Sequence, residues 1–343
     1  MRIESAYFEI TNLCNLNCAT CYNRSGLNHV RRELSFAHLQ QILQRLSSEF
    51  DCHSFAFAGG EPLLYSELPA LFSFIRAHSE LQFSFVTNGI KHDPDFLTLV
   101  HTYPDRIKVQ VSLDGSCEAV NALTRGAGSF ARTLSFIDQL AVKNFRPTIK
   151  MVISQNNIQD VESFYQLALE HGGIPSFAFV SNSGNASSDW NSMQVTPRQK
   201  VQVLKLLNRL NEANPTYPTA LPHSGSVCTL SDPTQAVSAL IKNDGSLSPC
   251  QLLYDERFFA GNILTDPTEE IIQNIQNLQA LAQKRLKADF GCSRCALHKS
   301  CPRGCLANAL TLCGDPMGDD GDCLTRKLEF FDYGLPKERS ISK

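Results

Sequence analysis

Two hydrophobic patterns alternate along the first two thirds of the chain. Short apolar runs with a period of two, the spacing of strands, are each followed by a longer segment with helical spacing. The pattern predicts strands over 6–11, 54–58, 82–86, 107–113, 147–153 and 176–180. It predicts helices that begin near Ser35, 67, 95, 129, 158 and Thr196-Pro197.

Six consecutive strand–helix units of this kind predict a parallel sheet with right-handed crossovers. The fold class is therefore α/β, with a partial (β/α)6 TIM-like barrel and its helices on the outside. An open doubly wound sheet is the alternative. In both architectures ligands bind beyond the carboxyl ends of the strands, so the residues that follow each strand are the informative ones.

A loop with three cysteines, Cys14-Asn-Leu-Asn-Cys18-Ala-Thr-Cys21, follows the first predicted strand. The next cysteine is Cys52, so no fourth thiol lies nearby in the sequence. Three cysteines on a four-iron cluster leave one iron without a protein ligand, and an open metal position is where chemistry takes place. From these residues alone, a zinc site or unrelated buried thiols remain alternatives.

Glycine-rich or polar segments follow the other strands. Taken singly, each is ordinary turn chemistry. Their combination at one end of a barrel, beside three thiols, predicts a site for a small molecule. The segments are Gly59-Gly60-Glu61-Pro62, Thr87-Asn88-Gly89, Ser112-Leu113-Asp114-Gly115 with Arg125 beyond it, and Gly184-Asn185-Ala186.

Composition narrows the functional classes. The 343 residues are 43% hydrophobic, which is ample for a globular core. The chain has 31 basic and 34 acidic residues and so lacks the excess of positive charge that is typical of proteins that bind polyanions. We therefore expect no nucleic-acid partner. We also expect no membrane segment and a cytoplasmic location, because the chain lacks a signal peptide and any long apolar run. Thirteen cysteines in a reducing compartment favour metal ligation over disulfides.

The strand–helix pattern stops near residue 213, after a proline-rich linker. We expect a barrel domain over 1–212 and a small cysteine-rich iron–sulfur domain over 213–343. Lys242-Asn-Asp-Gly245 predicts a hairpin turn. Seven of the eight cysteines in this part follow one pattern. The alternative is a structural zinc site, but seven thiols are more than the ligands of a single tetrahedral site and suit two clusters better. The seven are Cys228, Cys250, Cys292, Cys295, Cys301, Cys305 and Cys323.

The cysteine loop and the Gly-Gly-Glu-Pro segment resemble the radical S-adenosylmethionine superfamily. The resemblance implies a [4Fe-4S] cluster on Cys14, Cys18 and Cys21, with S-adenosyl-L-methionine (AdoMet) chelating the open iron. It implies that Gly59, Gly60 and Glu61 meet the methionine amino group, Ser112 and Arg125 the ribose or carboxylate, and Asn185 and Ala186 the adenine, with Asn88 as a further cofactor contact. Thr20 stands where the superfamily commonly has an aromatic residue, and Tyr22 follows the third cysteine instead.

The later cysteines resemble the SPASM domain, which carries auxiliary clusters in radical enzymes that modify peptides and proteins. By this resemblance, two auxiliary iron–sulfur clusters are implied. Cys228, Cys250 and Cys305 would hold the first, whose fourth ligand is open. Cys292, Cys295, Cys301 and Cys323 would hold the second. For Cys52, Cys117 and Cys313 we expect buried or merely tolerated thiols.

The resemblance implies an oxidoreductase in which a 5′-deoxyadenosyl radical takes a hydrogen atom from a ribosomally made peptide, which is then oxidised or cross-linked. The implied partners are a peptide or protein substrate and a flavodoxin- or ferredoxin-type electron donor. Alternatives are an anaerobic sulfatase maturase, a tetrapyrrole- or haem-modifying enzyme, and a non-catalytic electron carrier. A carrier needs neither Gly-Gly-Glu-Pro nor Arg125 to bind a small cofactor.

Two further expectations concern parts that the sequence leaves undefined. The first strand begins within about ten residues of Met1, so we expect no leader-binding domain ahead of the barrel. The catalytic acid or base is not assigned. Asp114 lies on the cofactor face by its motif, but it is an equally good turn residue.

Overall fold

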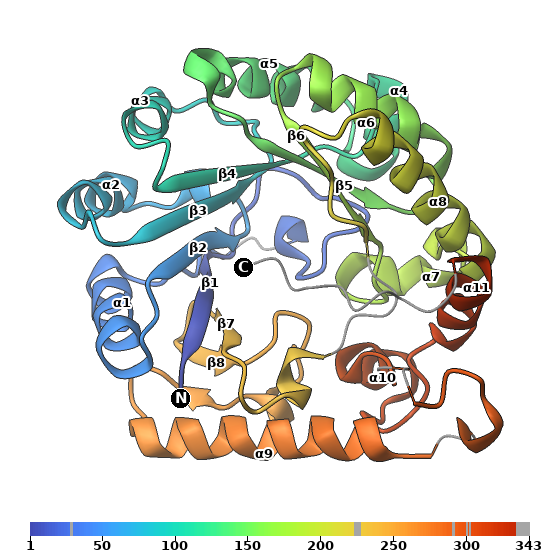
Figure 1. Cartoon of the computed structure of the whole chain (residues 1–343). Coiled ribbons are helices and arrows are strands. Elements are labelled where there is room, and N and C mark those ends of the chain that lie inside the picture. The colour runs from blue at the N-terminus through green and yellow to red at the C-terminus, as the bar shows by residue number, and fades with distance from the viewer. Residues whose placement is uncertain (28–29, 223–227, 290–291, 300, 302, 334–343) are drawn as a thin grey trace.

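A curved parallel sheet forms the centre of the computed structural model, which describes residues 1–27, 30–222, 228–289, 292–299, 301 and 303–333 (Figure 1). The strand order in the described residues is β6-β5-β4-β3-β2-β1-β7-β8-β9. The first six strands are parallel, so the predicted partial (β/α)6 barrel is confirmed. Their bounds are β1 Ile3–Thr11, β2 Ser54–Gly59, β3 Gln82–Thr87, β4 Ile107–Ser112, β5 Thr148–Ile153 and β6 Ile174–Phe179.

Helices line the outside of this sheet (Figure 1). Ser35 accepts a hydrogen bond from the backbone of His38 and begins the first helix, as the sequence predicts. Thr196 begins another through a capping box with Gln199. The helices are α1 Phe36–Phe50, α2 Leu68–Ala77, α3 Pro94–Thr102, α4 Glu118–Arg125, α5 Phe130–Leu140, α6 Val161–Glu170, α7 Trp190–Met193 and α8 Pro197–Ala213.

The two faces of the sheet have opposite characters. Aromatic side chains face the helices: Phe85 of β3 lies 4.9 Å, ring centre to ring centre, from Phe96 of α3. Because successive side chains of a strand alternate, the residues between the aromatic ones point to the concave inner face. That face carries mostly small or polar residues. They include Ala56, Ser84, Gln110, Ser112, Lys150 and Ser176.

The cysteine-rich part continues the same sheet. Its first strand, β7 (Val237–Ile241), pairs in parallel with β1, on the edge opposite β2. A turn in which Gly245 N–H donates to Lys242 C=O then leads into β8 (Ser246–Ser248), which confirms the predicted hairpin. The remaining elements are β9 Gly261–Asn262, α9 Thr268–Lys287, α10 Leu306–Cys313 and α11 Cys323–Tyr333. The proposed boundary near residue 213 therefore separates two parts that share one sheet.

Candidate active site

The three-cysteine loop follows β1 and lies against the Gly-Gly-Glu-Pro segment that follows β2. Gly60 N–H donates to Thr11 C=O at 2.7 Å, and Glu61 N–H donates to Leu13 C=O at 2.7 Å. A Cβ atom on Gly60 would stand 1.9 Å from the carbonyl oxygen of Leu13, so only glycine permits this approach. The pair of glycines thus brings the loop and the second strand end together.

The carboxylate of Glu61 is buried and fixes the ends of two strands. It accepts hydrogen bonds from Thr87 Oγ1 at 2.7 Å, from Asn88 N at 2.8 Å and from Leu63 N at 3.1 Å. Burial raises the pKa of Glu61, while these hydrogen bonds act in the opposite direction. The Asn88 side chain in turn donates to Cys14 Sγ at 3.7 Å and to Asn15 Oδ1 at 2.8 Å. Glu61 and Asn88 therefore hold the cysteine loop in place.

A buried ion pair lies beside the second cysteine. Arg125, the last residue of α4, places its Nε 2.8 Å from Asp114 Oδ2 and its Nη1 3.9 Å from Cys18 Sγ. Asp114 is fully buried and also accepts from the backbone N–H of Val152 at 2.7 Å. The backbone of α4 supports the loop as well, because Ala19 N–H donates to its Thr124 carbonyl. Asp114 is thus the partner that orients Arg125, rather than a turn residue alone.

The segment after β6 closes the opposite side of the loop. Asn185 N–H donates to Cys21 C=O at 2.9 Å, and its side chain donates to Cys18 C=O at 2.8 Å. Gly184 has φ +56°, and a Cβ there would stand 2.1 Å from the Cys21 carbonyl oxygen. Ala186 is fully buried beneath this contact. The structure therefore places Asn185 and Ala186 against the cysteine loop, and their contact with adenine stays a prediction.

The environment of Cys14 and Cys18 opposes the ionisation of their thiols in the absence of a metal. Burial raises the pKa of Cys14 to about 12, helped by the nearby Glu61 and the other two cysteines. Burial also raises the pKa of Cys18, against the lowering effect of Arg125. Thiolates at this position therefore need a cationic ligand, which iron supplies. Among the described residues, no three His, Cys, Asp or Glu side chains meet closely enough to hold a single metal ion. Cysteines of a four-iron cluster bind separate irons and need not converge on one point.

A buried carboxylate that sequence analysis missed connects the two halves of the chain. Glu9 of β1 accepts hydrogen bonds from Tyr22 Oη at 3.2 Å, from Asn23 Nδ2 at 3.3 Å and from Tyr254 Oη. The two tyrosine rings meet edge to face with centres 5.5 Å apart. Burial raises the pKa of Glu9. Because Tyr22 follows Cys21 and Tyr254 follows Cys250 by four residues, this contact joins the first cysteine loop to the cysteine-rich part.

Three later cysteines gather beyond β8. Cys250 lies within electrostatic reach of Cys305 and Cys228, and burial raises the pKa of Cys250 to about 11. Arg285 of α9 is buried nearby and donates to the carbonyls of Pro316 and Gly318 at 2.6 and 2.8 Å. These are the residues that the resemblance assigns to the first auxiliary cluster.

The second set of cysteines lies between α9 and α11. Burial raises the pKa of Cys323, and the nearby Cys292 adds to this effect. Cys301 lies close enough to Arg326 to favour the charged form of that arginine. Arg326 makes two hydrogen bonds to Asp320, at 2.8 and 2.7 Å. Asp320 also accepts from the backbone N–H of Cys305 at 3.0 Å. This buried pair therefore connects the two auxiliary sets. Cys295 N–H donates to Cys292 C=O in the same turn.

The spare cysteines lie elsewhere. Cys52 is fully buried in the core, and Cys117 is exposed ahead of α4. Cys313 is exposed at the end of α10, where its thiol donates to the carbonyl of Ala309 at 3.1 Å.

Ser112 lies on the inner face of the barrel, level with Lys150.

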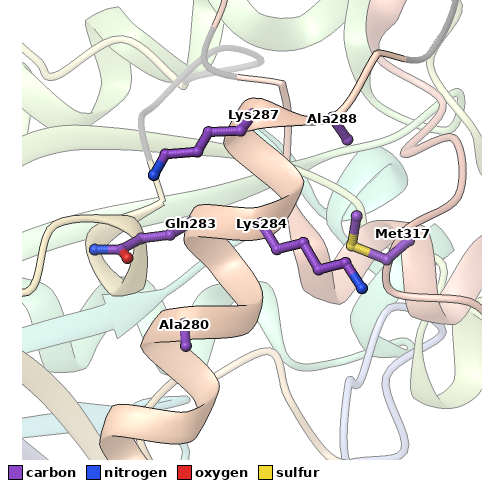
Figure 2. A pocket seen from close by; sticks show the side chains of 6 residues that line it. All are labelled: Ala280, Gln283, Lys284, Lys287, Ala288 and Met317. Atoms are coloured by element: carbon purple, nitrogen blue, oxygen red, sulfur yellow. The ribbon is translucent and has the colours of Figure 1, made fainter.

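A surface hollow of about 510 Å³ lies along the last turns of α9 (Figure 2). Its side chains include Lys284 and Lys287, which extend along the surface, and Met317 from the loop opposite. None of its lining residues is a cysteine or belongs to the strand ends described above. The hollow is therefore separate from the candidate active site.

Comparison with known proteins gives the family. Residues 8–168 match the model of the Radical SAM superfamily. Mycofactocin maturase MftC of Mycobacterium ulcerans is 30% identical over 338 residues, which cover 96% of this chain and 88% of that protein. The chain belongs to the radical SAM superfamily. The predicted superfamily is thereby confirmed, and membership implies AdoMet and a four-iron cluster as cofactors.

Solved structures of radical SAM proteins share the fold of the whole chain. Native anSMEcpe with bound AdoMet and Cp18Cys peptide superposes with a TM-score of 0.76 at 20% identity, covering 98% of this chain and 97% of that one. Streptococcus suis SuiB bound to precursor peptide SuiA gives a TM-score of 0.73 at 14% identity, covering 95% and 76%. At these identities the likeness concerns the fold alone.

Over the described residues, no helix is both long and apolar enough to cross a membrane.

Proposed function

We propose that this radical SAM protein modifies a ribosomally made peptide, which it oxidises or cross-links. The observation that carries the proposal is the likeness to mycofactocin maturase MftC over nearly the whole chain, cysteine-rich part included. A second relative, the sporulation killing factor maturation protein SkfB of Bacillus subtilis, is 25% identical over 277 residues. Both are maturation proteins by name. The peptide would lie along the inner face of the barrel, where small side chains such as Ala56 and Ser84 alternate with the outward-facing aromatic ones.

The residues beside the cysteine loop fit the radical cluster and AdoMet. When bound, these cofactors supply a 5′-deoxyadenosyl radical that removes a hydrogen atom from the substrate. Cys14, Cys18 and Cys21 would hold the cluster. Arg125, kept in orientation by Asp114, is the natural partner of the methionine carboxylate. The Gly59–Glu61 segment would meet the amino group, with the Glu61 side chain holding that segment rigid through its three hydrogen bonds.

The cysteine-rich part would hold two auxiliary iron–sulfur clusters. In support, Cys250 lies close enough to Cys228 and Cys305 for their charges to interact, and the same holds for Cys323 and Cys292. Cys295 and Cys301 would complete the second set. The auxiliary clusters would carry electrons during substrate oxidation. A flavodoxin- or ferredoxin-type protein would be the electron donor that reduces the radical cluster. A reducing cytoplasm suits the free thiols.

Peptide modification is tested directly by mass spectrometry. The anaerobically reconstituted protein should remove hydrogens in multiples of two from its substrate when AdoMet and dithionite are supplied. The candidate substrates are the mycofactocin precursor peptide and the small peptides encoded beside this gene. Omission of AdoMet is the control. Turnover of a free tetrapyrrole with no change in any peptide would overturn the proposal.

The first auxiliary cluster has only three assigned thiolates, and we propose that Cys313 is not its fourth ligand. The Cys313 thiol points into its own loop, toward the carbonyls of Ala309 at 3.1 Å and Asp315 at 3.6 Å. The remaining iron would be open or closed by a non-cysteine ligand.

The variant Cys313→Ser should therefore keep the iron and sulfide content of the wild type. Inductively coupled plasma and sulfide assays on the reconstituted protein measure this. Cys305→Ser is the matched comparison at the start of the same helix, and it should lose one cluster. Loss of a whole cluster from Cys313→Ser would make Cys313 a ligand and exclude the open site.

A further inference from the structure

A partly buried lysine lies in the middle of the inner face of the barrel, while a second lysine, Lys108, lies on the same face at the exposed start of β4. Lys150 of β5 is level with Ser112 of β4 and Ser176 of β6. The next residue, Met151, is level with Phe177, whose ring packs on the outer helix α6. Since successive side chains alternate across a strand, Lys150 points away from that helix and into the barrel.

The ammonium group of Lys150 has no partner within the part of the chain that the structure describes. No hydrogen bond or ion pair is formed by its side chain there. Burial lowers the pKa of Lys150, and no neighbouring charge offsets that effect. Within the described residues of the barrel, the other buried charged groups have partners: Arg125 forms an ion pair with Asp114, Glu61 accepts from three donors, and Glu9 accepts from Tyr22 and Tyr254.

An unpaired cation in a partly buried site is costly, and an anion that enters the barrel would relieve the cost. The methionine carboxylate of AdoMet already has a candidate partner in Arg125, next to the cysteine loop. AdoMet has no other anionic group, so the anion for Lys150 belongs to the substrate. The hydroxyl group of Ser176 flanks the lysine on β6 and can donate to the same group, whereas Ser112 on β4 is the residue that the family resemblance assigns to AdoMet.

We propose that Lys150 is the substrate-positioning residue of the barrel and binds a carboxylate of the peptide. The proposal rests on the peptide-modifying function proposed above. The carboxylate belongs either to the peptide's C-terminus or to an Asp or Glu side chain. Both present the same pair of oxygens to an ammonium group, so the chemistry of the site is the same and the experiment distinguishes the sources.

A first experiment needs no substrate. The folded holoprotein is treated with acetic anhydride, and the acetylation rate of Lys150 is followed by peptide mapping. N-acetylglycine, which carries a carboxylate, should slow the labelling of Lys150 several-fold, whereas uncharged N-acetylglycinamide should not. Lys108 of β4, which is exposed, is the internal control and should react equally in both. Equal labelling of Lys150 with the two compounds would overturn the proposal.

A second experiment measures peptide affinity. Lys150→Met should weaken binding of the mycofactocin precursor, or of whichever flanking peptide the wild type modifies, by about 10- to 100-fold. AdoMet binding should stay unchanged. Lys150→Arg should retain most of the peptide affinity, and Lys108→Met all of it. For the wild type, the same loss of affinity should follow either C-terminal amidation of the peptide or its Asp/Glu→Asn/Gln changes, depending on which carboxylate is bound. Lys150→Met should bind that altered peptide and the unaltered peptide with equal affinity.

These outcomes separate the two proposals. If the wild type modifies a peptide but Lys150→Met binds it as tightly, the role of Lys150 is wrong and the proposed function stands. If Lys150→Met loses AdoMet affinity instead, the lysine serves the cofactor and the substrate role is excluded. If no peptide is bound or modified, the proposed function fails, and the labelling experiment still decides whether Lys150 binds a carboxylate.

Discussion

Replacing Cys14, Cys18 and Cys21 together by alanine should reduce dithionite-dependent formation of 5′-deoxyadenosine to background. Asn88 and Arg125 donate to the thiols of Cys14 and Cys18, and Asn185 donates to the backbone carbonyls of Cys18 and Cys21, all at the carboxyl ends of the barrel strands. The variant should lose about four iron atoms per chain and keep the auxiliary clusters, because those cysteines lie in a separate part of the chain. Chromatography of the nucleoside and an iron assay on the same sample measure both effects.

The control for this variant is Cys117→Ala, which removes an exposed thiol ahead of α4. It should retain both the nucleoside formation and the iron content of the wild type. Formation of 5′-deoxyadenosine by the triple variant would show that the radical arises elsewhere, and the assignment of the loop would then be wrong.

The second large effect is expected for Arg125→Ala. Loss of a charge-assisted hydrogen bond to the methionine carboxylate should weaken AdoMet binding by about 1.5–3 kcal/mol. The variant also leaves the Asp114 carboxylate buried without its cation, which should lower the free energy of unfolding by about 3–5 kcal/mol. Calorimetric AdoMet titration and urea unfolding of the same preparation measure the two losses.

A double variant separates the cofactor contact from the stability of the pair. Arg125→Met with Asp114→Asn removes both charges, so most of the unfolding free energy should return while AdoMet affinity stays low. If the double variant recovers AdoMet binding as well, Arg125 supports the fold and does not contact the cofactor.

The order of the barrel was predictable because its strands and most helices follow the hydrophobic period closely. Helix α4 was missed for a physical reason: its buried residues are the polar Asn121, Thr124 and Arg125, while Leu123 is 57% exposed. The apolar residues of α4 therefore lie on its exposed side, contrary to the rule that the apolar side of a helix faces the core. The buried polar side serves the site, since Arg125 reaches Cys18 and Thr124 holds the backbone of the cysteine loop.

The motifs gave the positions of the site residues but not their contacts. Glu61 was expected to meet the cofactor, yet its carboxylate already binds Thr87, Asn88 and Leu63. The bond between Glu9 and Tyr254 joins residues 245 positions apart, a distance over which neither periodicity nor spacing carries information. The pairing of β7 with β1 likewise joins strands that are more than 200 residues apart in the chain, and nothing in the local sequence of either strand identifies its partner.

Transfer of hydrogen from peptide to cofactor is the most direct test of the whole account. The peptide that loses hydrogens in the mass assay is prepared from deuterated amino acids and incubated with the reconstituted protein, AdoMet and dithionite. We predict that 5′-deoxyadenosine carries deuterium and that its amount rises in proportion to the amount of modified peptide. Modified peptide accompanied only by unlabelled 5′-deoxyadenosine would contradict hydrogen abstraction by the radical formed at Cys14, Cys18 and Cys21.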